Sequence, residues 1–140
     1  MGTWGTGYFE NDTALDFMGD IEEADDPKEL FEETLAETMD MDFLDADQGA
    51  AVIVIGAYID RQRNGTQYSA PEHPGSIDID TFPDRHPDID FSELRTTVIK
   101  ALKKVLANDS ELNELWAENE GAYPVWRRNI EMLIERLSEK

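Results

Sequence analysis

The feature that most constrains the fold of this 140-residue chain is one long apolar run, from Ala50 to Ile59. It reads Ala-Ala-Val-Ile-Val-Ile-Gly-Ala-Tyr-Ile, in a sequence that is otherwise amphipathic and very acidic. A segment that is apolar on every side has to be buried, and amphipathic helices need such a surface on which to pack. We therefore expect a domain built around a central apolar helix at residues 48–63.

A strand is the competing interpretation of Val52 to Ile55, because β-branched residues favour strands. A helix is preferred because the polar residues 60–63 continue the segment without a break and because the flanking segments are helical. Asp45 or Asp47 is the expected cap at its start, and Asn64-Gly65 is its expected end.

Amphipathic spacing and capping residues predict five further helices. The first two are expected after Asn11 or Asp12, and at Asp26-Pro27-Lys28-Glu29, where Asp is the cap and Pro takes the first helical position. Their predicted buried residues are Ala14, Leu15, Met18 and Ile21 in the first, and Leu30, Phe31, Leu35 and Met39 in the second.

The other three helices are expected in the last third of the chain. Ser92, the segment Asn108-Asp109-Ser110, and Pro124 are their predicted starts. Their predicted buried residues are Leu94, Val98, Ala101, Leu102 and Val105, then Leu112, Leu115 and Trp116, then Trp126, Ile130, Leu133, Ile134 and Leu137.

A long proline-rich loop at residues 65–90 separates the two halves, since it has four prolines and no helical period. The sequence therefore predicts an all-α fold: a single compact domain of about six helices, spanning residues 1–140, around the central apolar helix.

The net charge is −20, and nearly all of it lies in the first half of the chain. Residues 1–60 hold 17 Asp and Glu and one Lys, a net of −16, whereas residues 61–140 have a net of −4. Affinity for nucleic acid comes mainly from cations that replace counterions on phosphates, so direct binding to nucleic acid is not expected.

The first two predicted helices carry rows of carboxylates spaced three or four residues apart. Like charges at this spacing destabilise a helix by about 0.2–0.5 kcal/mol per pair, and almost no Lys or Arg lies between them. The sequence favours a basic protein partner for this surface, with the contact residues Asp16, Asp20, Glu23, Glu29, Glu33 and Glu37. Two alternatives stay open: docking of the rows on Arg95, Lys100, Lys103 and Lys104 within the chain, and adaptation to a saline host.

The two ends of the chain resemble a bacterial family called domain of unknown function 4259. The opening segment reads Met-Gly-x-Trp-Gly-x-Gly-x-Phe-x-Asn-Asp, and its characteristic residues are Trp4, Gly5, Gly7, Phe9, Asn11 and Asp12. The closing segment is Asp109-Ser-Glu-Leu-x-Glu-Leu-Trp116, followed by Trp126. The resemblance implies a bacterial, largely helical domain and carries over no catalytic residue. It also suggests that Trp4 packs near Trp116.

Residue patterns for catalysis and cofactors are weak. The acidic segments at 40–47 and 78–80 lack the glycine and glutamate of an EF-hand loop, there is no Glu-x-x-His, and no Gly-x-Ser-x-Gly occurs. We expect no metal, no cofactor and no enzymatic activity. The alternative is a small enzyme or ligand-binding protein that uses the 65–90 loop, with His73 and His86.

The expected location is cytoplasmic, without membrane insertion. The sequence has no cysteine and no recognisable secretory signal, and its longest apolar run is far shorter than the roughly 20 residues that cross a bilayer. The sequence analysis thus predicts a non-enzymatic, acidic protein-binding module of the inhibitor or immunity-protein type.

Overall fold

A 19-residue helix, α3 (Ala46–Asn64), lies at the centre of the molecule. The structure is a computed structural model that describes residues 12–65 and 87–138. All residues of α3 from Gly49 to Asp60 are buried, and Val52 to Ile55 are helical rather than extended. A helix that is apolar all round is stable in water only when other elements cover it, and here other helices pack against it from more than one side.

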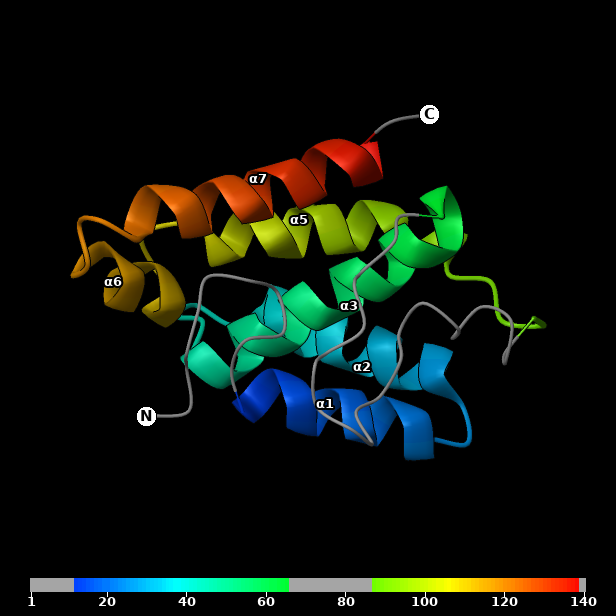
Figure 1. Cartoon of the computed structure of the whole chain (residues 1–140). Coiled ribbons are helices and arrows are strands. Elements are labelled where there is room, and N and C mark those ends of the chain that lie inside the picture. The colour runs from blue at the N-terminus through cyan, green and yellow to red at the C-terminus, as the bar shows by residue number, and fades with distance from the viewer. Residues whose placement is uncertain (1–11, 66–86, 139–140) are drawn as a thin grey trace.

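Two pairs of helices flank α3 (Figure 1). On one side lie α1 (Asp12–Glu23) and α2 (Pro27–Asp40), and on the other side lie α5 (Arg95–Val105) and α7 (Tyr123–Ser138). The short α6 (Glu111–Ala117) lies at one end, and the 3-10 helix η2 (Ser92–Leu94) leads into α5. The described residues form one all-α domain of six α-helices without a β-strand, as the sequence predicted.

Local capping explains where several helices begin and end. Asp26 accepts a hydrogen bond from the Glu29 amide at 3.2 Å, and Asp45 accepts one from the Gln48 amide at 2.8 Å. Both satisfy amides of a first helical turn that have no partner within the helix. Gly65 ends α3 with a φ of 71°, a left-handed conformation that glycine adopts without strain.

Three details of the sequence prediction were wrong. Met39 is 40% exposed and Leu115 is 48% exposed, although both were expected to be buried. Near the end of α2 the buried residue is Thr38 rather than Met39. The Thr38 hydroxyl donates to the Thr34 carbonyl at 2.8 Å. Ser92 begins a 3-10 turn without a side-chain cap, and α5 starts at Arg95.

The segment between α2 and α3 is fixed by the segment between α5 and α6. Leu44 forms a parallel bridge with Ser110: its amide donates to the Asp109 carbonyl and its carbonyl accepts from the Glu111 amide, both at 2.8 Å. The Leu44 side chain is fully buried, whereas neighbouring Phe43 is 50% exposed. This bridge joins the first and last thirds of the chain at one end of α3.

Candidate functional site

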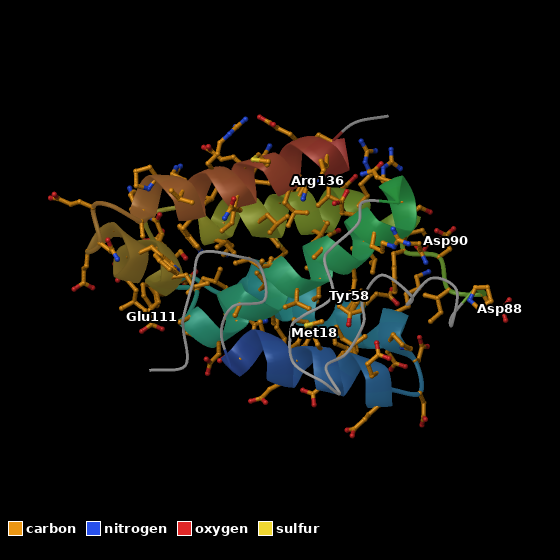
Figure 2. The ribbon with its side chains drawn as sticks, viewed as in Figure 1. Met18, Tyr58, Asp88, Asp90, Glu111 and Arg136 are labelled. Atoms are coloured by element: carbon orange, nitrogen blue, oxygen red, sulfur yellow. The ribbon has the colours of Figure 1, made fainter. Side chains whose placement is uncertain are left out.

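The acidic surface predicted from the sequence is formed by α1 and α2, on one side of α3 (Figure 1). On α1, Ala14, Met18 and Ile21 are buried with at most 1% exposure. Figure 2 shows Met18 directed from α1 toward α3. Asp16, Asp20 and Glu23 are exposed and repeat at the same helical spacing on the opposite face.

A second row of carboxylates follows α2. Glu29, Glu33 and Glu37 are exposed, with about 6 Å between neighbours along the helix axis. The opposite face of α2 buries Phe31, Thr34, Leu35 and Thr38. In the described part of the chain, no ion pair involves any of the six predicted contact residues.

Lys28, the one cation of α2, pairs with a residue outside that helix. Its ammonium group lies 3.1 Å from a carboxylate oxygen of Glu93, at the start of the second half of the domain. The hydrogen bond from Lys28 to Glu93 raises the pKa of Lys28. Lys28 therefore forms no ion pair with any of the six predicted contact residues.

The fold also changes the titration of the Asp90 carboxylate. Its Oδ1 accepts a hydrogen bond from the Ser92 amide at 2.9 Å, and the Ser92 hydroxyl contributes further. Bonds to the ionised form lower the pKa of Asp90. This carboxylate stabilises the turn that enters η2, which is a structural role.

The cations of α5 do not neutralise the acidic rows. Lys104 donates to the carbonyl of Met41, and the Arg95 guanidinium donates to the carbonyls of Leu137 and Ser138. Lys100 and Lys103 are exposed, on the other side of α3 from α1 and α2. Internal docking of the acidic rows on these four cations is therefore absent from the described residues.

The closing sequence motif has a structural explanation. Ser110 is buried, and its hydroxyl accepts a hydrogen bond from the Asn113 amide at the start of α6. The carboxylate of Glu111 accepts from the Ala46 amide at 2.7 Å, so it caps α3 from a position 65 residues away (Figure 2). The ring of Trp116 stacks on that of Trp126, with centroids 5.9 Å apart and planes inclined by 14°.

The opening motif lies mostly outside the described residues. Trp4, Gly5, Gly7, Phe9 and Asn11 belong to the segment 1–11, so the predicted contact between Trp4 and Trp116 stays a prediction. Asp12 is the first residue of α1.

The proline-rich loop at 65–90 also lies mostly outside the described residues, together with His73 and His86. Its described end carries Asp88 and Asp90, which are exposed on the outside of the molecule (Figure 2). In the described ranges, no three His, Asp or Glu side chains come together in a way that could hold a metal ion. No described helix is long and apolar enough to span a bilayer.

An open depression of about 410 Å³ lies between α5 and α7. Leu106 and Ile134 form its apolar part, and Lys103, Arg128, Glu131 and Glu135 surround them. Arg128 and Glu135, both on α7, are paired at its edge at 3.3 Å.

Sequence reasoning missed a buried polar cluster at the other end of α3. Asp60 is fully buried, and its Oδ2 accepts from Nε of Arg136 at 2.8 Å (Figure 2). Its Oδ1 accepts from the Asn64 amide group at 2.7 Å, and Asn64 also donates to the Arg136 carbonyl. In the sequence, Asp60 belongs to a polar stretch that resembles the exposed end of a helix. Its burial depends on the packing of α7 against α3, which the local sequence does not indicate.

A family model described as "Domain of unknown function (DUF4259)" matches residues 2–129. No curated protein and no solved structure matches the chain.

Proposed function

The chain belongs to the domain of unknown function 4259 family, and from that premise we propose that it is a non-enzymatic protein-binding domain whose acidic face meets a basic partner. The acidic face is defined as the exposed carboxylates of α1 and α2: Asp16, Asp20, Glu23, Glu29, Glu33 and Glu37. A bacterial source and a cytoplasmic location are part of the same proposal.

The observation that carries this proposal is that no described basic side chain pairs with the acidic face. The six carboxylates are exposed, form no ion pair with a described residue, and lie on two neighbouring helices on the same side of α3. Repulsion within such rows destabilises the free protein. A partner that supplies cations relieves the repulsion, and its approach is accelerated by the long-range field of the acidic face.

The partner we propose is a protein with a cationic binding surface, such as a nuclease or a nucleic-acid-binding protein. Carboxylates spaced along two helices present negative charge to a surface that otherwise binds phosphates. Acidic inhibitors and immunity proteins are the analogous class of protein. The analogy rests on charge alone, because a fold does not by itself assign a function.

The test compares two triple variants that have the same change in net charge. Glu29→Gln, Glu33→Gln and Glu37→Gln remove three charges from the acidic face. Glu114→Gln, Glu118→Gln and Glu120→Gln remove three exposed charges at and beyond α6. The partner is first captured at low salt from the native host, purified, and its affinity for each variant is measured by calorimetry.

We expect the acidic-face variant to bind at least about tenfold more weakly, with slower association, because charge near an interface governs the encounter. The α6 variant should stay within about twofold of the wild type. Equal affinities for both variants, or equal losses in both, would show that the acidic face is not the contact surface.

A further inference from the structure

Asn64-Gly65, at the end of α3, is the one Asn-Gly pair in the sequence. An asparagine followed by glycine is chemically labile in a peptide, because the glycine nitrogen can attack the asparagine side chain and no glycine side chain obstructs the approach. Both residues are exposed, so water can reach the reacting atoms. The structure therefore has a labile pair at its surface, next to the buried Asp60.

The reaction of this pair is deamidation, and water is its only co-reactant. A bond forms between the Gly65 nitrogen and Cγ of Asn64, and the bond between Cγ and Nδ2 breaks. The side-chain nitrogen leaves as ammonia, taking the proton of the Gly65 nitrogen, and a cyclic imide is formed. Water then opens the imide at either carbonyl. The product is aspartate or the isomer whose main chain runs through the former side chain.

The fold directs the Asn64 amide away from the attacking nitrogen. Its Nδ2 donates to Oδ1 of Asp60 at 2.7 Å and to the carbonyl of Arg136 at 3.0 Å. Both partners are acceptors, so the amide nitrogen rather than the amide oxygen belongs at this position. Asp60 lies four residues earlier, one helical turn back along α3. The side chain is thus held toward the start of the helix, whereas the Gly65 nitrogen lies on the other side of Asn64.

The attacking nitrogen is also engaged. The Gly65 amide donates to the Arg61 carbonyl at 3.0 Å, and the Gly65 carbonyl accepts from the Arg61 guanidinium at 2.8 Å. Asn64 itself has the helical backbone of α3. Attack requires the reacting atoms to approach within about 3–3.5 Å in the correct orientation. Reaching that geometry breaks hydrogen bonds of both reacting groups.

We propose that Asn64 is a deamidation site, which the contact of Asp60 with Arg136 of α7 keeps unreactive in the folded protein. The reaction proceeds when the end of α7 moves away and releases the Asn64 amide. The product has a carboxylate in place of the amide donor, beside the Asp60 carboxylate and the Arg136 carbonyl, which are both acceptors. The modified chain cannot restore these hydrogen bonds, so the deamidated fraction measures how often this end of α7 has opened.

The experiment measures deamidation at Asn64 in the full chain at mildly alkaline pH, by peptide mapping and mass spectrometry. The reference is the same chain unfolded in guanidinium chloride. We expect the folded protein to deamidate at least about tenfold more slowly, because the reactive geometry requires a local opening. Equal rates in the folded and unfolded chains would overturn the proposal.

Two double variants test the role of the buried contact. Asp60→Leu with Arg136→Met removes the side-chain acceptor of Asn64 together with the buried charges, and it should speed deamidation by about three- to tenfold. The matched control, Arg128→Met with Glu135→Leu, removes an exposed ion pair of α7 and should leave the rate within about twofold of the wild type.

A core variant controls for a loss of global stability. Leu35→Ala in α2 leaves a cavity in the core and keeps the contacts of Asn64. It should deamidate more slowly than Asp60→Leu with Arg136→Met, even if urea unfolding shows that it is the less stable of the two. Rates that simply follow global stability, or a double variant no faster than the wild type, would contradict control of the site by this contact.

The variant Asn64→Asp reproduces the aspartyl product. Hydrogen exchange in peptides covering the end of α7 should be about three- to tenfold faster in this variant than in the wild type, and exchange in α2 should be unchanged. Equal exchange at the end of α7 would contradict the loss of the contact in the modified chain. None of these measurements requires a partner, so their outcome is independent of the proposed function.

Discussion

Asp60 shows how a single side chain can connect two helices that are far apart in sequence. Its carboxylate is fully buried at the end of α3 and bonds to Arg136 of α7, with Asn64 on its other oxygen. Carrying an ionised carboxylate from water into a core is unfavourable, and the geometry of its partners decides how much of that penalty is offset.

Arg136→Met should therefore destabilise the protein by about 3 kcal/mol, because the methionine retains bulk but removes the ion pair from a buried carboxylate. Urea unfolding followed by circular dichroism measures this change. The double variant Asp60→Leu with Arg136→Met should recover much of the loss, since it removes the buried charge as well. If the free energy of unfolding of Arg136→Met lies within about 0.5 kcal/mol of the wild type, Arg136 contributes little to stabilising the buried Asp60.

At the scale of the helix, the surroundings of glycine differ between α1 and α3. Gly56 of α3 lies where three helices approach closely: an added β-carbon would be 3.1 Å from Leu102 of α5 and 3.1 Å from Leu133 of α7. Gly19 of α1 has open space beside it. The first glycine is needed for packing, and the second is not.

We expect Gly19→Ala to stabilise the protein by about 0.5–1 kcal/mol through helix propensity. Gly56→Val should instead destabilise it by about 1–3 kcal/mol through overpacking between α5 and α7. Thermal and urea unfolding of both variants test the pair. A stabilising Gly56→Val substitution would contradict the close packing around α3.

Elements with local signals could be predicted from the sequence. The cap at Asp26 and the end at Gly65 depend on residues a few positions away, and the structure has them as expected. For α3 the structure selects Asp45 over Asp47, and for α6 it selects Ser110 within the predicted starting segment. Exposure depends on where neighbouring helices end, which helical periodicity does not reveal. Met39 and Leu115 continue the spacing of apolar positions, yet both are exposed.

Long-range polar contacts were beyond sequence reasoning for a similar reason. Glu111 has the pattern of an ordinary residue in the first turn of a helix, but its carboxylate caps α3. Gln62 resembles a solvent-exposed residue near a helix end, but it accepts from the Phe91 amide and donates to the Ile89 carbonyl. Of the candidate site, the sequence could indicate which carboxylates are exposed, but not that Lys28 pairs with Glu93.

At the scale of the whole molecule, acidic and basic residues are concentrated in different helices. Residues 12–45 contain 14 acidic residues and one lysine, whereas α5 and α7 together contain seven basic residues and two acidic ones. Since α1 and α2 lie together on one side of α3, repulsion is concentrated on that side of the domain (Figure 1). Self-repulsion of this kind destabilises a compact state, and salt screens it.

Global stability should therefore rise by about 1–2 kcal/mol between about 10 mM and 300 mM NaCl and then level off, because the Debye length is already short at that concentration. Urea unfolding across a salt series measures this dependence. A stability that continues to rise steeply up to molar NaCl would instead support adaptation to a saline host.

The bridge between Leu44 and Ser110 has a consequence for how the chain folds. It closes a loop of more than sixty residues, and the Glu111 cap of α3 forms at the same junction. The Ala46 amide, in the first turn of the central helix, thus acquires its acceptor only after the start of α6 has arrived. Contacts of such sequence separation slow folding and make it cooperative. A nascent chain that ends before α6 therefore lacks contacts that fix the start of the central helix. The two halves of the sequence depend on each other to form the native state.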